Sequence, residues 1–309
     1  MGAATADFDG DGRPDIYVAN DTEPNFLFRN LGNGRFEEEA LIRGVALNQH
    51  GVAVSSMGVD FRDVDNDGRP DLFVTDLAHE GWLLFRNVGL HFEEVSDVSR
   101  VALLSLRSSG WSNAIADFNN DGWKDLLAVT GHAMDNVASL EDAMYALPNM
   151  LLLNQGNGTF ADVSGKAGRD FLQPLPHRGS AVADFNNDGL LDTAISALGN
   201  QAQLLINTMA EPGHWSMIRL RGHSSNRDGL GAVLRLETPD GHVQWNQATT
   251  SVGFASSGDP RVHFGLGRND RVRILEVFWP SGRKQRLANP PIDRVLDVEE
   301  PEQSGEVVP

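Results

Sequence analysis

One nine-residue pattern of acidic and amide residues occurs four times in the chain, at residues 7–15, 63–71, 117–125 and 184–192. The copies read DFDGDGRPD, DVDNDGRPD, DFNNDGWKD and DFNNDGLLD, so every copy has Asp or Asn at positions 1, 3, 5 and 9 and Gly at position 6. Calcium takes six to eight oxygen ligands in a flexible shell, and glycine allows the backbone to turn sharply. The pattern therefore predicts up to four Ca²⁺-binding loops.

The predicted ligands are the side chains at positions 1, 3, 5 and 9 together with the main-chain carbonyl of position 7. They are Asp7, Asp9, Asp11, Arg13 and Asp15 in loop 1, Asp63, Asp65, Asp67, Arg69 and Asp71 in loop 2, Asp117, Asn119, Asp121, Trp123 and Asp125 in loop 3, and Asp184, Asn186, Asp188, Leu190 and Asp192 in loop 4. Loops 1 and 2 are the stronger candidates, because Asn at position 3 leaves loops 3 and 4 with one negative charge less.

Two other interpretations of the loops are disfavoured. Asp, Asn and Gly are common in ordinary turns, but four copies with the same five positions occupied are poorly explained by turns alone. An EF-hand requires an acid at position 12, and position 12 is Val18, Val74, Ala128 or Ile195 here. The flanking segments also have the apolar character of strands rather than helices.

The composition of the chain argues against some classes of function. The formal net charge is −18, and 14 of the 43 acidic residues are predicted loop ligands, so four bound Ca²⁺ ions would bring the total to −10. This acidity argues against a nucleic-acid partner, which needs a basic surface. The chain has no cysteine and therefore no disulfides. No apolar run approaches the roughly 18 residues of a membrane span.

The N-terminus lacks the basic start and apolar core of a signal peptide, and the chain begins inside a repeat. We expect an upstream segment that holds a leader and earlier repeats.

The loops begin at residues 7, 63, 117 and 184, and such spacings are typical of propellers. In each unit an apolar strand enters the loop and another leaves it. A third strand ends in Asn and leads to a tight turn, Gly-Asn-Gly in two units, of the kind that closes hairpins. A fourth strand with alternating acids follows in the first three units. The third strands are Phe26–Asn30, Leu83–Asn87, Met150–Asn154 and Leu204–Asn207. The prediction is an all-β fold of blades with four antiparallel strands.

Two insertions interrupt the later units. Residues 131–148 are expected to include a short helix from Ser139 to Tyr145, and residues 165–178 are expected to form a surface loop. His132 and His177 are interpreted as lone loop histidines.

Together, the loop, the Asn-terminated strand and the turn resemble FG-GAP/VCBS repeats, the blades of integrin-α-type propellers, over residues 1–210. The resemblance implies a structural calcium in the loop between the first two strands of each blade. Propellers of that family usually have about seven blades, and the fourth unit has no obvious outer strand, so we expect an incomplete propeller.

After Pro212-Gly213 the pattern changes to further strands without metal loops, which predicts a second, small all-β domain at residues 213–298 and an acidic, disordered tail at residues 299–309. His214-Trp215, the run Ser225–Ala232, His263–Gly267 and Trp279-Pro280-Ser281-Gly282 resemble an ASPIC/UnbV domain. Repeats followed by this domain imply the cartilage-acidic-protein-like group. Residues 252–258 are expected to be loop, and Ser225–Asp228 either binds a ligand or forms a self-satisfied turn.

No constellation for catalysis is present: there is no G-x-S-x-G elbow, H-E-x-x-H site, Walker loop or cysteine nucleophile. Carboxylates that share a calcium would stay ionised and donate protons poorly. The sequence therefore predicts an extracellular, periplasmic or cell-surface scaffold that binds a protein or glycan partner, with calcium in a structural role. The alternative is an enzyme or biosynthetic accessory protein that uses the propeller face or the interdomain cleft. Convergent His, Arg and Asp in that cleft would favour the alternative.

Overall fold

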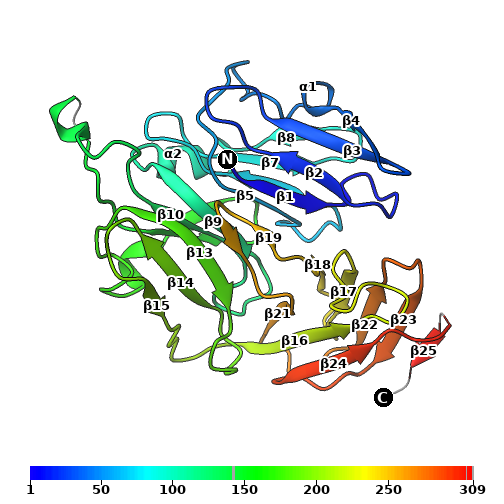
Figure 1. Ribbon diagram of the computed structural model, residues 1–309. Coiled ribbons are helices and arrows are strands. Elements are labelled where there is room, and N and C mark those ends of the chain that lie inside the picture. Colours follow the sequence, from blue (N-terminus) through cyan, green and yellow to red (C-terminus); the bar gives the residue numbers. More distant parts are fainter. Residues whose placement is uncertain (141–142, 304, 308–309) are drawn as a thin grey trace.

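The computed structural model describes residues 1–140, 143–303 and 305–307 (Figure 1). Its first two thirds consist of four antiparallel sheets, which we call blades 1 to 4. Blade 1 contains β1 (Ala3–Ala6), β2 (Asp15–Val18), β3 (Phe26–Gly32) and β4 (Arg35–Glu38). Blade 2 contains β5 (Val59–Arg62), β6 (Asp71–Val74), β7 (Leu83–Asn87) and β8 (Phe92–Glu94). Blade 3 contains β9 (Gly110–Ala116), β10 (Asp125–Thr130), β11 (Met150–Asn154) and β12 (Phe160–Asp162). Blade 4 contains β13 (His177–Ala183), β14 (Asp192–Ala197) and β15 (Gln203–Leu205), so it has three described strands.

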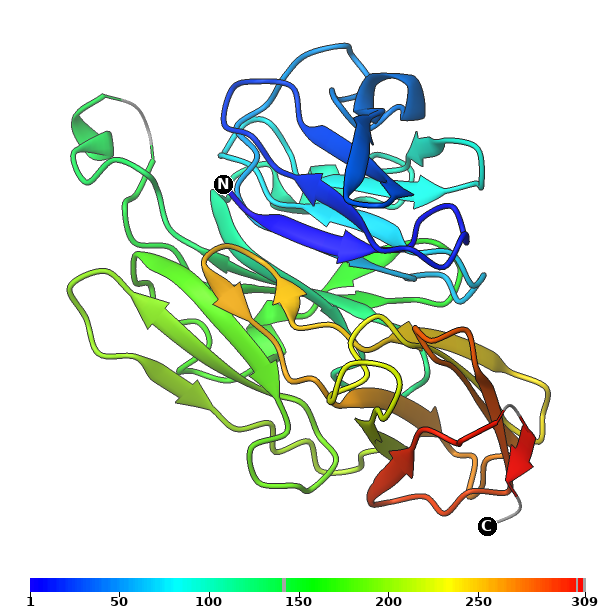
Figure 2. The ribbon, with the colours of Figure 1, turned by 45° about the vertical axis from the view of Figure 1, so that its right-hand side comes forward.

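The blades form an arc around a common axis, with their first strands innermost. β1 lies beside β5, β5 beside β9, and β9 beside β13, and blades 1 and 4 form the two ends of the arc (Figures 1 and 2). Apolar clusters fill the spaces between neighbouring blades. The predicted all-β fold of four-stranded blades is confirmed, and blade 4 is three-stranded, in line with the missing outer strand.

Short helical segments connect the strands. They are α1 (Ala40–Arg43), α2 (Val101–Ser105) and the 3-10 helices η1 (Val137–Ser139) and η2 (Ser164–Lys166). The helix predicted from Ser139 to Tyr145 is wrong in the described residues, because η1 ends at Ser139 and residues 143–145 are not helical. Residues 141–142 lie outside the described residues. The loop assignment of His177 is also wrong, since this residue begins β13 and is fully buried.

The C-terminal region forms a small β domain of two sheets around one apolar core. One sheet has the order β21-β16-β24, formed by Val262–Gly267, His214–Arg221 and Val295–Glu299. The other has the order β18-β17-β22-β23-β25, formed by Val243–Gln247, Val233–Glu237, Ile274–Phe278, Lys284–Ala288 and Gly305–Val307. The structure differs from the predicted disordered tail at Gly305–Val307, which pairs in parallel with β23.

A hairpin of the C-terminal domain fills the axis of the arc. Its strands, β19 (Ser251–Val252) and β20 (Ser256–Ser257), contact the inner strands of all four blades between them. Gly253 N–H donates to the Val59 carbonyl of β5 (2.7 Å), and the Phe254 ring lies 4.9 Å from that of Trp111. The expected loop at residues 252–258 is therefore an ordered hairpin, because the blades supply partners that its own sequence does not reveal. Within the described residues, no helix has the length and apolar content needed to cross a membrane.

Candidate metal loops and the interdomain cleft

The position 9 aspartate is bonded in the same way in all four loops. In loop 1, Asp15 accepts one hydrogen bond from Phe8 N–H (3.0 Å) and another from Asn30 N–H in β3 (2.7 Å). The equivalent residues Asp71, Asp125 and Asp192 make the same pair of bonds. Each carboxylate oxygen keeps a further lone pair, so this residue ties the loop to the third strand and can still offer oxygen to a cation.

The position 1 aspartate and the position 6 glycine close the loop. Asp7 accepts a hydrogen bond from Gly12 N–H (2.7 Å), and the same contact recurs in the other three loops at 2.8, 2.8 and 2.9 Å. The four glycines have φ between +85° and +92°. Glycine is needed here because an L side chain is strained in the left-handed region.

In loops 1 and 2 the structure brings together the position 1, 3 and 9 carboxylates. The oxygens of Asp7, Asp9 and Asp15 lie within 4.8 Å of one another, and the same is true of Asp63, Asp65 and Asp71. All three donors of each set are hard oxygen atoms, which suits calcium rather than a soft metal. These residues therefore fit a bound calcium ion.

The position 5 carboxylates do not join these clusters. Asp11 and Asp67 pair with Arg13 and Arg69 at position 7 of their own loops. In loops 3 and 4 the position 3 amides of Asn119 and Asn186 donate to Asp121 (2.9 Å) and Asp188 (2.8 Å). In all four loops the position 7 N–H also donates to the position 5 carboxylate. Position 5 therefore supports the turn in this geometry, and its role as a ligand stays a prediction.

Burial raises the pKa of several position 1 and position 9 carboxylates. Burial, reinforced by neighbouring carboxylates, raises the pKa of Asp15 to about 7, that of Asp63 to about 6 and that of Asp117 to about 7. Burial also raises the pKa of Asp71 and Asp125 well above the ordinary value. A divalent cation would offset both effects, because it supplies opposite charge where water is excluded.

Lys124, at position 8 of loop 3, is a buried cation that the sequence analysis missed. Its side chain is 4% exposed, and its Nζ donates to Asn66 Oδ1 of loop 2 (3.1 Å). Burial lowers its pKa, although Asp63 and Asp117 oppose this effect. The signal was a basic residue at a position that is Pro or Leu in the other copies.

Loops 2, 3 and 4 are linked in series through the asparagine at position 4, which is Gly10 in loop 1. Asn66 Nδ2 donates to the Gly122 carbonyl of loop 3 (3.0 Å), and Asn120 Nδ2 donates to the Gly189 carbonyl of loop 4 (3.1 Å). Asn187 of loop 4 accepts instead from Arg261 of the C-terminal domain (2.8 Å). The C-terminal domain thus takes for loop 4 the place that the following loop has for loops 2 and 3.

The same domain rests on the position 6 glycines of loops 2, 3 and 4. A Cβ atom added to Gly68 would lie 3.2 Å from the Trp245 ring, one added to Gly122 would lie 3.2 Å from Gln244 and His242, and one added to Gly189 would lie 2.0 Å from the Trp215 ring. At Gly12 of loop 1 the same space is open. Three of the four candidate metal loops therefore form a platform for the domain, and loop 1 does not.

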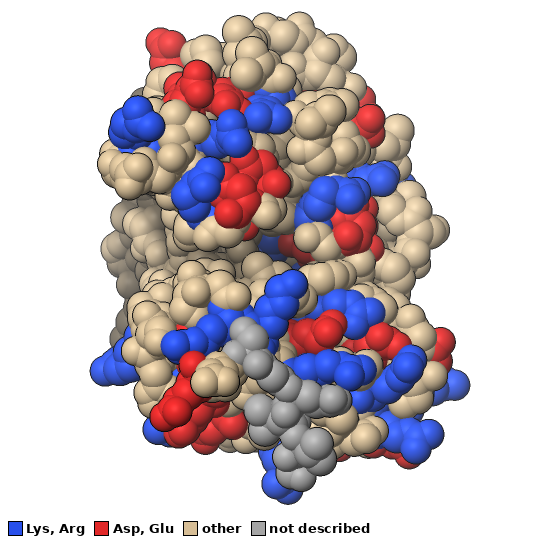
Figure 3. All heavy atoms as spheres, turned by 90° about the vertical axis from the view of Figure 1, so that its right-hand side faces the viewer, with Lys and Arg blue, Asp and Glu red and all other residues tan. Residues whose placement is uncertain are grey.

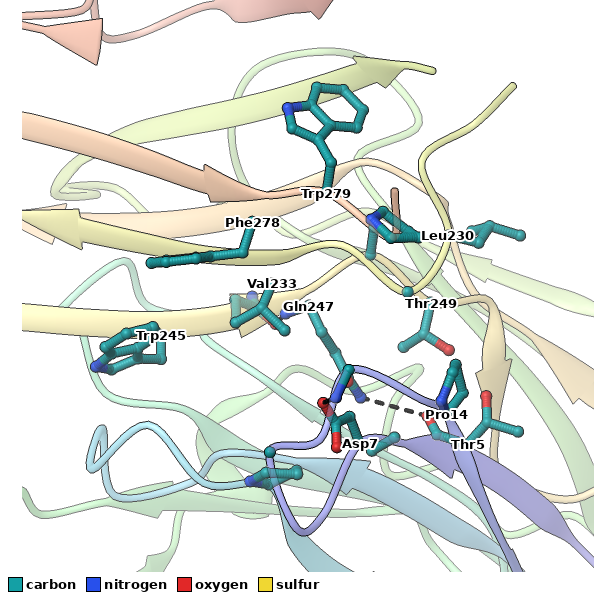
Figure 4. A pocket seen from close by; sticks show the side chains of 18 of the residues that line it. Thr5, Asp7, Pro14, Leu230, Val233, Trp245, Gln247, Thr249, Phe278 and Trp279 are labelled. Atoms are coloured by element: carbon teal, nitrogen blue, oxygen red, sulfur yellow. Dashed lines mark hydrogen bonds between the residues drawn. The ribbon is translucent and has the colours of Figure 1, made fainter. Parts of the chain in front are cut away.

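Loop 1 faces a cleft of about 620 Å³ between blade 1 and the C-terminal domain. Figure 3 shows it as a hollow with acidic and basic side chains on both sides, and Figure 4 shows its walls. Asp7 and Pro14 lie on one wall, and the stacked rings of Trp245 and Phe278, 5.9 Å apart, lie on the other. Gln247 reaches across to the Thr5 carbonyl (3.5 Å). Both domains contribute to this cleft, and no histidine is among its described lining residues.

The loop Ser225–Asp228 is held by the chain itself. The Glu300 carboxylate accepts from the N–H groups of His223, Ser224 and Ser225 at 2.7 to 2.8 Å, and from Ser281 Oγ at 2.6 Å. Although burial opposes the effect, these bonds hold the pKa of Glu300 at about 2. The structure therefore favours the self-satisfied turn, anchored by an acid that the sequence analysis placed in the tail.

Known families match both parts of the chain. The FG-GAP-like repeat matches residues 7–74 and 63–128, and ASPIC and UnbV matches residues 222–305. The chain therefore belongs to the FG-GAP repeat proteins that carry a C-terminal ASPIC/UnbV domain, which confirms the predicted resemblance.

Its relatives include cartilage acidic protein 1. The Homo sapiens protein is 31% identical over 296 residues, and the Mus musculus protein is 28% identical over 300 residues. Each comparison covers 92% of this chain and 42% of the relative, so the chain spans less than half the length of these homologues.

Similarity to solved structures is weak. An Agrocybe aegerita lectin described as recognising non-reducing terminal N-acetylglucosamine has a TM-score of 0.36 at 20% identity, covering 66% of this chain and 51% of the lectin. The BP39L lectin from Burkholderia pseudomallei has a TM-score of 0.34 at 10% identity, covering 96% of this chain and 87% of the lectin. Scores this low support no inference about fold or ligand.

Proposed function

We propose that this protein is an extracellular scaffold in which calcium holds the blades and the ASPIC/UnbV domain in one arrangement, and that a protein or glycan partner binds on the surface so formed. The observation that carries the proposal is the repeated oxygen-donor loop, whose position 6 glycine supports the C-terminal domain in three of four copies. Calcium in these loops would serve the structure, because the carboxylates are committed to hydrogen bonds that close each loop.

The energetics support a structural role. Two like charges 4 Å apart repel by about 1 kcal/mol in water and by about 4 kcal/mol at an effective dielectric of 20. Each of loops 1 and 2 gathers three carboxylates within such distances. A bound cation replaces this repulsion with attraction, and the interface with the C-terminal domain gains a rigid platform.

Calorimetric titration with calcium tests this role. We expect at least two sites, which are loops 1 and 2, and fewer sites in Asp7→Ala and Asp63→Ala variants. Asp135→Ala, a substitution outside the loops, is the control and should bind as wild type. Unchanged stoichiometry in both loop variants would show that the ligands are assigned wrongly.

The interdomain cleft is the surface that we propose for the partner. Its aromatic wall offers apolar contact, and the polar groups around it offer directional hydrogen bonds, a combination typical of binding sites. Screening against arrays of glycans and of secreted proteins, with Phe278→Ala beside wild type, tests this placement. A partner that binds both proteins equally would have to bind elsewhere.

A further inference from the structure

A second, smaller cavity lies between the blades and the C-terminal domain, and we call it the Lys124 cavity. It has a volume of about 60 Å³, and its lining includes residues of β5, β9 and loop 3 on one side and of β18 and β21 on the other. Each water molecule takes about 30 Å³ in the liquid, so the space suits one small ion with a water molecule. His263, Arg62 and Asp60 converge here, but the space is too small for a sugar or a peptide.

Two acids in the lining already have basic partners. Asp60 accepts from Arg62 Nε at 3.2 Å and from Ile115 N–H at 2.8 Å. Asp259 accepts from Arg261 Nε at 2.7 Å. Since each of these acids is paired with its own arginine, neither is left to balance a further positive charge.

Lys124 has no such partner. Its side chain is 4% exposed, and its ammonium group has three donors. Among the described residues, Nζ has one hydrogen bond, to the neutral Asn66 side chain (3.1 Å), and forms no ion pair. Burial and, in addition, the nearby Arg62 guanidinium lower the pKa of Lys124, so a second cation lies close to it. A buried charge without a counter-charge is costly, and an anion in the cavity would offset this cost.

His263 supplies a second unsatisfied group. Its Nε2 lies 3.1 Å from the Gly189 carbonyl, which can only accept, so Nε2 carries the proton and Nδ1 carries a lone pair. Nδ1 is buried and has no hydrogen-bond partner among the described residues. The contents of the cavity must therefore offer an acceptor to Lys124 and a donor to His263. An anion accompanied by a water molecule offers both.

The remaining acids near Lys124 belong to the loops. Asp117 lines the cavity, and Asp63 and Asp117 both attract the Lys124 ammonium. Both are predicted calcium ligands, and a bound Ca²⁺ would take over their negative charge. In this respect the inference rests on the proposed function. With calcium in the loops, Lys124 is the cation without a counter-charge among the described lining residues.

We propose that the Lys124 cavity binds a small monovalent anion, such as chloride or formate, through the Lys124 ammonium. Lys124 belongs to loop 3, Arg62 to β5 and His263 to β21. The anion would therefore lie where two blades meet the C-terminal domain, and its binding would stabilise the docking of that domain on the blades.

Anomalous diffraction from crystals grown in calcium and bromide tests the site directly. Bromide stands in for chloride, and we expect its anomalous peak in the cavity, within hydrogen-bond distance of Lys124 Nζ. The peak should be absent from Lys124→Leu, which reproduces the position 8 residue of loop 4. It should persist in the control Lys166→Leu, because Lys166 is exposed and lies outside the cavity. Water alone in the wild-type cavity, or an adventitious ion only, bound at the surface, would overturn the proposal.

Thermal unfolding in excess calcium measures the effect in solution. At matched ionic strength, saturating chloride or formate should raise the wild-type midpoint by at least about 2 °C over gluconate, which is too large for the cavity. The anion with the larger shift is the preferred ligand. The shift should be lost in Lys124→Leu and kept in Lys166→Leu. Lys124→Gln is the second variant should Lys124→Leu fail to fold.

The same samples separate this inference from the calcium role. Wild type that binds calcium in the calorimetric titration but has equal midpoints in all three anions would overturn the anion site alone. Wild type that binds no calcium would overturn the proposed function, and the bromide peak would then decide the anion site independently.

Discussion

Acidic positions that look equivalent in the loop motif have different roles in the structure. Position 9 is both a proposed ligand and a connector, because its two oxygens accept from the loop and from the third strand. Position 3 is less constrained, since the chain itself uses Asp in two loops and Asn in the other two. Substitution of Asp by Asn should therefore have different effects at the two positions.

Asp71→Asn should destabilise the fold by about 1–3 kcal/mol, because the amide nitrogen would face a buried backbone N–H and leave it unsatisfied. The matched control is Asp65→Asn, which reproduces the natural position 3 of loops 3 and 4 and should cost less than about 1 kcal/mol. Urea unfolding in excess calcium measures both. Equal losses in the two variants would remove the distinction between positions 9 and 3.

His263 should make stability depend on pH. It is buried, its Nε2 lies 3.1 Å from the Gly189 carbonyl, and burial lowers its pKa from 6.5 to about 4. Below pH 6.5 the unfolded chain binds a proton that the folded chain does not, so this residue's contribution is present above pH 6.5 and is lost as pH falls toward 4. Between pH 7 and 4.5 the loss should be about 2–3 kcal/mol.

Unfolding of wild type and His263→Gln at both pH values isolates this contribution, because the glutamine amide can still donate to Gly189. The variant should lack most of the extra loss at low pH. Parallel pH profiles for the two proteins would contradict the assignment.

At the scale of elements, the loops belong to the blades and also contact the C-terminal domain. Each loop joins the first two strands of its blade, and loops 2 to 4 also meet side chains of the C-terminal domain. The glycine at position 6 is therefore needed for two reasons. Locally it adopts a positive φ, and in loops 2 to 4 its lack of a side chain leaves space for a side chain of the C-terminal domain.

Gly189→Ala and Gly12→Ala separate these two reasons. Both glycines have positive φ, +90° and +85°, so both variants should lose about 1–2 kcal/mol to backbone strain. Only Gly189→Ala places its Cβ against Trp215, and we expect a further loss of about 1–3 kcal/mol from overpacking. Denaturant unfolding with intrinsic tryptophan fluorescence measures the difference, and equal costs would argue against docking on loop 4.

At the scale of the whole molecule, a hairpin and a row of loops join the blades to the C-terminal domain. Arg62 of β5 illustrates the connection, because it pairs with buried Asp60 and also donates to the Gln247 and Thr249 carbonyls at 3.4 Å. We therefore expect the two parts to unfold together while the loops are loaded with calcium.

Calcium in excess should raise the midpoint of thermal unfolding. At 100 times the dissociation constant each site adds about 2.7 kcal/mol, so loops 1 and 2 together should shift the midpoint by roughly 10 °C. Calorimetry in calcium, in chelator and in magnesium, which prefers a stricter octahedral shell, provides the comparison. A midpoint that is the same in calcium and in chelator would contradict a structural role.

Most of the blade architecture was predictable because its signals are local. The equivalents of Gly68 and Asp71 recur at fixed positions of each loop, an Asn such as Asn87 recurs after each third strand, and the alternation of β-strands follows from neighbouring residues. The prediction failed where distant partners decide conformation, as for the hairpin at Ser251–Ser257 and for the buried strand that begins at His177. The domain boundaries at residues 210 and 213 and the complete ligand sets remain predictions.

The sequence by itself determined the four repeated loops with their carboxylate and amide side chains, the blade type and the two families, because each depends on residues close together in the chain. Only the tertiary structure decided that Trp215 and Trp245 rest on loop glycines, that Lys124 is buried between two loops, and that position 5 turns away from the cluster. These features depend on how the side chains pack around the loops and exclude water from the loop carboxylates. The tryptophan and lysine contacts join separate segments of the chain, such as Trp245 with Gly68 and Lys124 with Asn66, and no local pattern records them.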